Sequence, residues 1–224
     1  MNDAPLYNSL ESVVQDDLFP VIDLALREGR HIASDEQAEF AFVREAQVFL
    51  EPLYRRYGCE LVQVNDGYFY LRPTGDRLGR RHLSAAEMLV GQALALLYLD
   101  PATVQSGGAA LRGQVVELLD NLVGKEKLVQ ALNRRRSGKR SERVAHELVR
   151  REIDQALRSL ARLGFVELMD GERLRLRPPV LRFAEPVRGL GDPMAGLQRL
   201  IERRDAVIVE LEEGGDERDE DDAG

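Results

Sequence analysis

Hydrophobic and polar positions repeat one arrangement twice along this chain. Residues 57–73 and 163–178 each have a glycine at an expected helix end, followed by a short apolar run, an Asp-Gly pair and a second run that closes on Leu-Arg-Pro. Asp-Gly favours the tight turn between two antiparallel strands, because both central residues of that turn need positive φ angles. The pattern therefore predicts two β-hairpins, each entered from a helix.

Helical periodicity precedes both hairpins. Apolar residues recur at three- and four-residue steps over residues 34–58, which predicts an amphipathic helix. Pro52 lies inside it and removes a backbone donor, so we expect a kink there or a break into two helices. The Ser84-x-x-Glu87 spacing predicts a capping box at the start of another helix. Helices are expected over the following further ranges: 18–29, 84–99, 111–123, 125–132 and 142–163.

The order of these elements is typical of a winged helix, in which helices lead into a two-stranded hairpin. A lone hairpin is marginal in water and needs a helical layer beneath it. We therefore expect a mainly α protein with short β-hairpins (α+β), built as tandem winged-helix domains, the first a helix short unless Pro52 splits its long helix. The expected divisions are a flexible N-terminus (1–15), two winged-helix domains (16–80 and 84–180), a C-terminal arm (181–209) and an acidic disordered tail (210–224).

The net charge of −8 is concentrated at the C-terminal end. Residues 210–224 contain nine acids and one arginine, whereas the rest of the chain carries 30 acids and 30 lysines or arginines. Such a density of like charge is typical of disordered segments. Two interpretations of this tail stay open. It is either a solubilising end, which is the favoured interpretation, or a mimic of nucleic acid that occupies a basic segment of the same chain.

Cysteine usage and hydropathy indicate the compartment. The single cysteine, Cys59, rules out a disulfide framework within one chain and favours a reducing, cytosolic setting. The N-terminal residues lack the basic and apolar regions of a signal peptide. The longest apolar run, residues 88–99, has 12 residues and includes Gln92, which is too short for a membrane span. It is apolar nearly all round and must be buried on every side, for which we favour a homodimer over internal burial.

Catalytic signals are weak. The three histidines, His31, His82 and His146, are scattered and form no zinc-ligand cluster. Two Gly-Lys pairs, at 124–125 and 138–139, lack the glycine that a phosphate-binding loop places five residues earlier. We interpret Cys59 as a small apolar strand residue. The sequence therefore predicts a protein that is not an enzyme and holds no cofactor or metal.

The basic segment over residues 125–151 is the stronger clue, with ten lysines or arginines against three glutamates. Such an excess attracts a phosphate backbone, and arginine suits bidentate phosphate contacts. Sequence-independent contact with double-stranded DNA is predicted for these residues: Arg134, Arg135, Arg136, Lys139, Arg140, Arg143, Arg150, Arg151, Arg158 and Arg162. The alternative is a solvated loop and helix surface, and it is the stronger one for Arg158 and Arg162 because arginine is a good helix former.

Five separated blocks resemble, in order and spacing, the MukE family of small accessory subunits of the bacterial MukBEF condensin, with the related MksE branch as an alternative. They are LFPVIDLALREGRHI, GYFYLRP, AEMLVGQALALLYLDP, LRSLARLGFVELM and LRFAEPVRGLGDP. The resemblance covers residues 18–204, and the acidic tail is similar in kind. Pro52 and the dense arginines over residues 134–143 depart from the family pattern.

This resemblance implies tandem winged helices, a homodimer, binding to a MukF-like kleisin and, through it, to a MukB-like SMC ATPase, which hydrolyses the ATP. It also implies DNA contact in chromosome condensation and segregation, and a cytoplasmic, nucleoid-associated location. Kleisin contact is expected at Tyr68 and Tyr70, taken as exposed on the first hairpin, and at Phe183, with core packing as the equal alternative. The runner-up function is a free-standing winged-helix transcription regulator, although its expected recognition helix offers Gln155 and little else to read bases.

Overall fold

The computed structural model describes residues 6–75, 77, 81–124, 128, 142–187, 192, 195–196 and 199, with residues 142–146 described as helix backbone only. The chain divides into two compact units. Unit 1 takes residues 1–82, 159–167 and 176–179, and unit 2 takes residues 83–158, 168–175 and 180–224. Two segments from late in the sequence therefore complete the unit that the first third of the chain builds.

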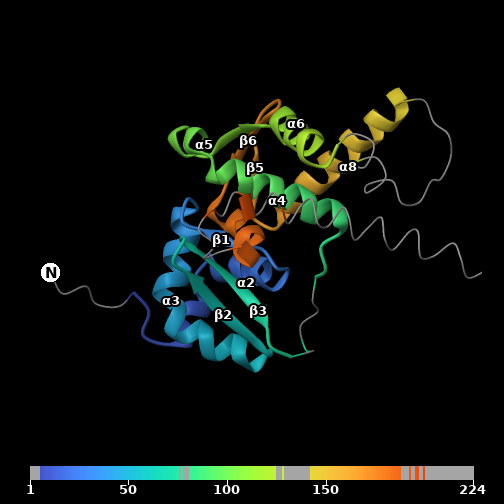
Figure 1. Ribbon diagram of the computed structural model, residues 1–224. Helices are drawn as coiled ribbons and strands as arrows, with labels where there is room; N and C mark the ends of the chain where they lie inside the picture. The colour runs from blue at the N-terminus through green and yellow to red at the C-terminus, as the bar shows by residue number, and fades with distance from the viewer. Residues whose placement is uncertain are drawn as a thin grey trace, which may run out of the picture. The chain divides into compact units, whose positions relative to one another are not determined.

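Unit 1 is a helical layer with one small sheet (Figure 1). Its main elements are α1 (Leu10–Val14), α2 (Phe19–Arg27), β1 (Ile32–Ala33), α3 (Gln37–Arg56), β2 (Cys59–Val64) and β3 (Tyr68–Pro73). The strands are antiparallel in the order β1–β3–β2, with Ile32 opposite Phe69 and Leu61 opposite Leu71. The predicted first hairpin is thus confirmed, and α1 lies where the sequence predicted no element.

Strand β3 is buried on both faces. Phe69 and Leu71 pack into the core that α1, α2 and α3 supply, whereas Tyr68 and Tyr70 form a second cluster with Ala33. Successive strand residues point to opposite sides of a sheet, so an unbroken apolar run needs cover on both. The sequence Tyr-Phe-Tyr-Leu over residues 68–71 is such a run.

Helix α3 is one continuous helix of 20 residues, so of the two outcomes expected at Pro52 the break into two helices is wrong, and the kink stays a prediction. Pro52 cannot donate to the carbonyl of Val48, four residues earlier. Both side chains are exposed, so this side of the helix faces water that can hydrate the carbonyl. The proline is tolerated because it lies on the solvent side of the helix.

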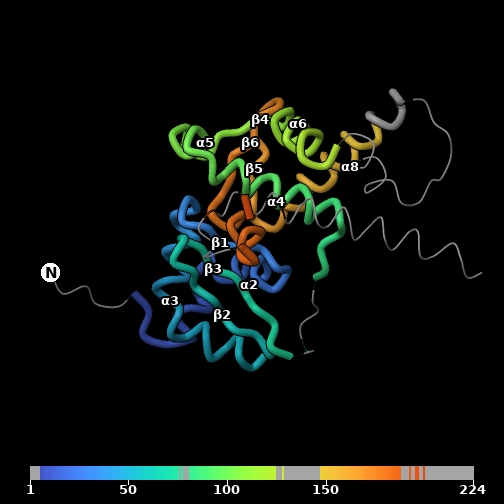
Figure 2. Tube along the Cα trace, viewed as in Figure 1, coloured from blue at the N-terminus to red at the C-terminus, as the bar shows by residue number. Residues whose placement is uncertain are grey.

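Unit 2 contains the remaining helices and the second hairpin (Figure 2). Its elements are α4 (Ala85–Leu99), α5 (Pro101–Gln105), β4 (Ala109–Leu111), α6 (Arg112–Val123), most of α8 (Glu142–Arg162), parts of β5 (Val166–Leu168) and β6 (Arg173–Leu176), and most of the 3-10 helix η1 (Pro178–Val187). The strand order is β4–β6–β5, with Ala110 opposite Leu174. The second sheet thus repeats the order of the first.

Helix α4 carries the predicted capping box. The Glu87 backbone N–H donates to Ser84 Oγ at 3.2 Å, and the Ser84 N–H donates to Glu87 Oε2 at 2.6 Å. All residues from 89 to 96 are buried within the single chain. Gly91 leaves room for the Phe183 ring, because a Cβ there would lie 2.3 Å from ring atom Cε1. One chain therefore supplies the burial that the sequence analysis attributed to a second copy, and the homodimer stays a prediction.

Glycines turn both hairpins. Gly67 and Gly171 adopt φ angles of +87° and +68°. Asp66 and Asp170 do not have positive φ, so in each turn the glycine supplies the left-handed conformation and its Asp neighbour does not. The predicted fold class, mainly α with short antiparallel hairpins, is confirmed. Among the described residues, no helix combines the length and apolarity needed to cross a membrane.

Candidate nucleic-acid interface

Helix α8 has an apolar side and a basic side. Ile153, Leu157 and Leu160 recur at three- and four-residue steps and are fully buried, so they form the inner face of the helix. Four arginines of this helix that were predicted to contact DNA are exposed: Arg150, Arg151, Arg158 and Arg162. Among these, residues 151, 158 and 162 are spaced seven and four apart, so they share one side of the helix. We call these three residues the arginine stripe.

No acid neutralises the arginine stripe within the described part of the chain. The ion pairs found there do not include Arg151, Arg158 or Arg162. Asp154 lies on the same side of α8 by helical spacing, but Arg112 Nη1 is 3.5 Å from its Oδ1. The exposed guanidinium groups are therefore available to phosphate oxygens, for which arginine has the matching fork of donors.

Arg112 links three elements of unit 2. It begins α6, its backbone N–H donates to Glu172 O at 2.9 Å in the second hairpin, and its side chain reaches Asp154 on α8. The start of α6, the hairpin turn and the middle of α8 therefore lie together. The sequence analysis did not single out Arg112. Its signal was a cation in the first turn of a helix, where the helix dipole disfavours positive charge unless an acid is close.

The second hairpin adds two exposed cations. Arg173 and Arg175 are exposed on β6 and alternate with buried Leu174 and Leu176. Alternation of this kind is typical of a sheet with one solvated face. Sequence reasoning missed these arginines as candidates, although the Arg-Leu-Arg-Leu pattern was the signal.

The basic loop emphasised by the sequence analysis lies outside the described residues. This applies to Arg134, Arg135, Arg136, Lys139 and Arg140. Arg143 lies in α8, but its side chain is not described. The four predicted residues on the described part of α8 are exposed. DNA contact itself stays a prediction for all ten residues.

The three predicted kleisin-contact residues are buried. Tyr68, Tyr70 and Phe183 are 0%, 7% and 5% exposed, so the expected exposure of the two tyrosines is wrong and core packing, the stated alternative, is confirmed. The His31 ring stacks on Tyr70 at 5.4 Å and lies 4.4 Å from the ring of Phe165. Aromatic rings thus cover the face of β3 that was expected to be open. Kleisin contact through these residues stays a prediction.

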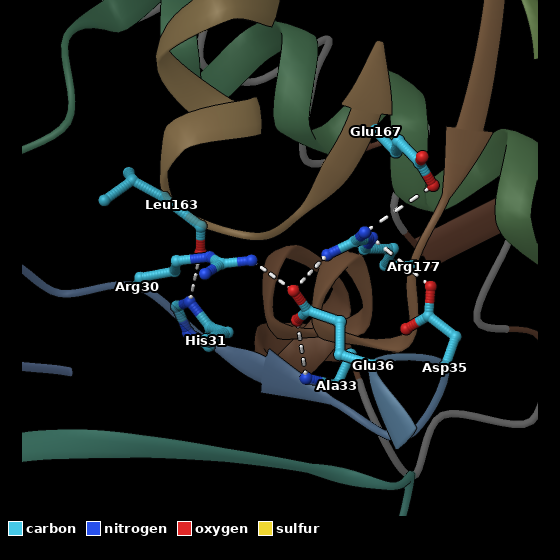
Figure 3. Close-up of polar contacts among 8 residues, drawn as sticks. All are labelled: Arg30, His31, Ala33, Asp35, Glu36, Leu163, Glu167 and Arg177. Carbon is cyan, nitrogen blue, oxygen red and sulfur yellow. Dashed lines mark hydrogen bonds and ion pairs between the residues drawn. The ribbon is translucent and has the colours of Figure 1, made fainter. Parts of the chain in front are cut away.

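The C-terminal end of α8 is anchored within unit 1. The backbone nitrogen and Nδ1 of His31 both lie 2.9 Å from the carbonyl oxygen of Leu163, and Figure 3 shows the ring contact. Gly164 follows with a φ of +79°, and a Cβ there would lie 2.4 Å from His31 O. These contacts fix the last turn of the helix and, with it, the backbone of Arg162.

An ion-pair cluster surrounds Arg177 in the same unit (Figure 3). Its guanidinium nitrogens lie 3.0 Å from Glu36 Oε1, 3.3 Å from Asp35 Oδ2 and 3.5 Å from Glu167 Oε2, and Arg30 also pairs with Glu36. Burial opposes the charge of Arg177, but Glu36 and Asp35 outweigh it, so the pKa of the guanidinium is raised. Because carboxylates of its own unit already surround Arg177, the cluster holds the fold and does not offer an anion site.

The described ranges offer neither a cluster of metal ligands nor an exposed thiol. No group of three or more histidine, cysteine, aspartate or glutamate side chains is placed there to hold a metal ion. Cys59 is 1% exposed, and burial raises the pKa of its thiol. A protonated, buried thiol packs as an apolar side chain, which agrees with the interpretation of Cys59 as a strand residue.

Comparison with known proteins identifies the relatives of this chain. The model of the MukE-like family matches residues 6–224. Proteins titled chromosome partition protein MukE are 35% identical to it in Escherichia coli (strain K12), over 90% of this chain and 86% of the relative, and in Haemophilus ducreyi, over 90% and 85%. The protein of the same title from Pasteurella multocida is also 35% identical, over 88% of this chain and 82% of the relative. The resemblance expected from the five sequence blocks is confirmed, and the chain belongs to the MukE-like family.

Proposed function

We propose that this chain is a non-enzymatic accessory subunit of an SMC (condensin-like) complex that acts in chromosome condensation and partition. Its membership of the MukE-like family over nearly its whole length carries the proposal. In this function the chain forms a homodimer, binds a MukF-like kleisin and, through the kleisin, joins a MukB-like SMC ATPase on the nucleoid. The ATPase hydrolyses the ATP, so this chain contributes binding surfaces to the complex.

Each unit supports a winged-helix interpretation. In both, a short strand follows a helix. The second strand of the hairpin then lies in the middle of the sheet, with the short strand on one side and the first strand of the hairpin on the other. Unit 1 places the single helix α3 between its first and second strands, whereas α6 and α8 lie between β4 and β5. We therefore interpret α8 as the recognition-type helix of the second winged helix and β5–β6 as its wing.

The exposed cations of α8 support contact with the phosphate backbone of DNA. The arginine stripe lacks ion-pair partners in the described part of the chain, and phosphate contacts position a protein without reading sequence. Gln155, which is exposed between Arg151 and Arg158, is the one amide among the described side chains of α8. This composition favours a sequence-independent scaffold over a transcription regulator, which would need several base-reading groups.

Fluorescence anisotropy with a random-sequence duplex at several salt concentrations tests this contact. The double variant Arg151→Gln/Arg158→Gln should bind more weakly, and its salt slope should fall by roughly 0.9 for each phosphate that the protein no longer neutralises. Arg44→Gln is the matched control, because Arg44 is exposed on α3 and pairs with Glu45 at 3.1 Å. Unchanged affinity and slope in the double variant would contradict the proposal. Tight binding to one preferred duplex would favour the transcription regulator.

Helix α2 offers an exposed apolar surface for the kleisin. Val21 and Leu24 lie one turn apart and are 61% and 58% exposed. Side chains of this type gain most from transfer out of water, and a subunit that binds a kleisin needs such an anchor site. We therefore propose the kleisin segment as the occupant of this surface.

Purification of the tagged chain from its native cells tests the kleisin contact, with mass spectrometry to identify what accompanies it. A kleisin and a large coiled-coil ATPase should be recovered together. Val21→Ser/Leu24→Ser should reduce the recovery of both, whereas Val104→Ser, at a residue of α5 that is 62% exposed, should not. Absence of both partners from the unmodified chain would overturn the proposed function. Equal recovery with all variants would mean that the kleisin binds a surface other than Val21 and Leu24.

A further inference from the structure

We propose that the acidic tail, residues 210–224, docks on the arginine stripe of α8 and competes there with the phosphate backbone of DNA. This inference rests on the DNA contact proposed for α8 and adds a regulatory segment to it. The tail is then an intramolecular occupant of the same surface that DNA uses. Three observations carry the inference: the charge of the tail, the exposed arginines without an acid partner among the described residues, and the length of chain between the two segments.

Charge complementarity is the first observation. The tail holds nine carboxylates and one arginine over 15 residues, whereas residues 1–209 have equal numbers of acids and bases. The arginine stripe presents cations that no described acid neutralises. A dense row of carboxylates resembles a phosphate backbone in charge and in hydrogen-bond acceptors, so the two compete for the same donors.

Tethering makes weak contacts sufficient. Exposed ion pairs contribute little one at a time and are screened by salt. A tail on the same chain, however, meets α8 at an effective concentration of about millimolar when the intervening segment is short. The tail therefore occupies the arginine stripe at low salt, and DNA displaces it because DNA presents more negative charges at the same time.

The length of the intervening chain permits the contact. Arg199 is the last described residue and belongs to unit 2, as do Arg151 and Arg158. The eleven residues from there to Glu210 span at most about 36–40 Å when extended. A compact domain of roughly 100 residues has a radius of gyration of about 13 Å, which corresponds to a sphere about 34 Å across. Half the circumference of such a sphere is about 53 Å, which the start of the tail does not span. The acids from Asp216 onward lie at least 17 residues beyond Arg199, or about 56 Å of extended chain, so they can reach any face of a unit of this size.

The consequence is a subunit whose free form is shielded from DNA. DNA held close by an assembled complex would displace the tail, because a duplex presents one phosphate charge about every 1.7 Å along its axis. DNA contact would then depend on assembly, even though the arginine stripe itself does not change. The tail acts here as a competitor and has no need to alter the fold.

A four-protein cycle tests the inference. The proteins are the full chain, residues 1–209, Arg151→Gln/Arg158→Gln, and both changes together, each titrated with the random-sequence duplex at about 0.1 M salt. Removing the tail should strengthen DNA binding by about three- to tenfold when the stripe is intact and by less than about twofold when it is not. Such non-additivity is the mark of two groups that contact each other.

The other outcomes separate the two proposals. Equal strengthening in both backgrounds would show that the tail acts through net charge alone and would overturn the docking inference. A tail deletion without effect, combined with weaker binding by the stripe variant, would also overturn it while leaving the DNA contact in place. Unchanged binding by the stripe variant in the 1–209 background would overturn the DNA contact itself.

A second measurement needs no DNA. Because Cys59 is the single cysteine and is buried, Cys59→Ala/Ala223→Cys allows a nitroxide to be attached to the tail alone. The label should broaden the amide signals of residues 150–158 in nuclear magnetic resonance spectra. Arg151→Gln/Arg158→Gln, or about 0.5 M salt, should restore these signals. Full-intensity signals in the labelled protein at low salt would overturn the inference.

Discussion

At the scale of single residues, arginine has two different roles in this chain, and its surroundings decide between them. Arg177 is largely buried among carboxylates of unit 1, so its charge stabilises the fold. Arg151 and Arg158 are exposed and have no acid partner in the described ranges, so their charges are open to an external ligand. The residue type is the same in both places. The role of each arginine depends on how far its side chain is buried and on whether carboxylates lie beside it.

Arg177→Met tests the structural role. Removing this largely buried cation leaves Glu36, whose side chain is 8% exposed, with Arg30 alone as its counter-charge. It also takes the shared cation from Asp35 and Glu167. We expect the free energy of unfolding to fall by about 3–5 kcal/mol in urea denaturation. Arg72→Met is the control, because Arg72 and its partner Glu60 are both more than half exposed, and it should cost less than about 1 kcal/mol. Equal effects would show that the buried cluster contributes no more than a surface pair.

Tyr7 and Asp16 predict a pH dependence. Tyr7 Oη donates to Asp16 Oδ2 at 2.6 Å, and this bond, together with donation from the Leu18 N–H, lowers the pKa of Asp16. A lowered carboxyl pKa stabilises the fold above the unfolded value of 3.8, and this stabilisation is lost as the pH falls through the folded value. Tyr7→Phe keeps the ring but removes the bond. It should therefore cost about 1 kcal/mol at pH 7, a value reduced for the exposure of Asp16, and less at pH 3.

Urea denaturation of both proteins at the two pH values measures this difference. The bond is also one reason, after burial, why the pKa of Tyr7 is raised to about 12, so the tyrosine stays protonated and able to donate at pH 7. A cost of Tyr7→Phe that is the same at pH 3 and pH 7 would mean that the hydroxyl contributes through packing and not through the charge of Asp16.

At the scale of elements, the two hairpins follow the same plan with different exposure. The strand β3 is apolar at four successive positions and is covered on both faces, whereas β6 alternates arginine and leucine and is covered on one. Strand β3 of the first hairpin is therefore buried in unit 1, whereas β6 of the second hairpin exposes its basic face to solvent. The exposed cations Arg173 and Arg175 of the second hairpin therefore belong to unit 2, as do Arg151 and Arg158 of the arginine stripe.

The glycine that ends α8 gives a prediction at this scale. Gly164 and Gly171 both have positive φ angles, but a Cβ at Gly164 would meet His31 O, whereas one at Gly171 meets nothing within 4 Å. Gly171→Ala should cost only the conformational penalty of about 1–2 kcal/mol. Gly164→Ala adds a clash of the new Cβ with the backbone oxygen of His31 and should cost clearly more, measured as the free energy of unfolding. Equal costs would mean that His31 can move away from the end of α8 without penalty.

At the scale of the whole molecule, charge is divided between a neutral body and an acidic tail. Deleting residues 210–224 changes the net charge from −8 to zero at pH 7. Because proteins near zero net charge associate and precipitate more readily, the 1–209 chain should be less soluble at low salt, as measured by light scattering against concentration. A chain with the tail acids replaced by their amides should behave like the truncated one. Unchanged solubility would show that the tail is not needed as a solubilising end.

Much of the local structure could be predicted from periodicity and turn residues. Patterns within about 20 residues are enough to predict the two hairpins, at residues 59–73 and 166–176, and the capping box at Ser84. The same is true of the apolar and basic sides of α8. The three residues of the arginine stripe were among the predicted DNA contacts, and that they share a face follows from helical spacing alone. The family resemblance was likewise carried by short blocks in a fixed order.

What covers each face was decided only by the tertiary structure. Nothing near Tyr70 in the sequence indicates that His31 stacks on it, and nothing near α4 indicates that Phe183 fills the space at Gly91. The exposure expected for the tyrosines and the second copy expected over α4 both arose because neither covering segment is close in sequence. Local sequence fixes which side of an element is apolar, because periodicity is a local property. The partner that buries that side comes from a distant segment, and only the folded chain brings the two together.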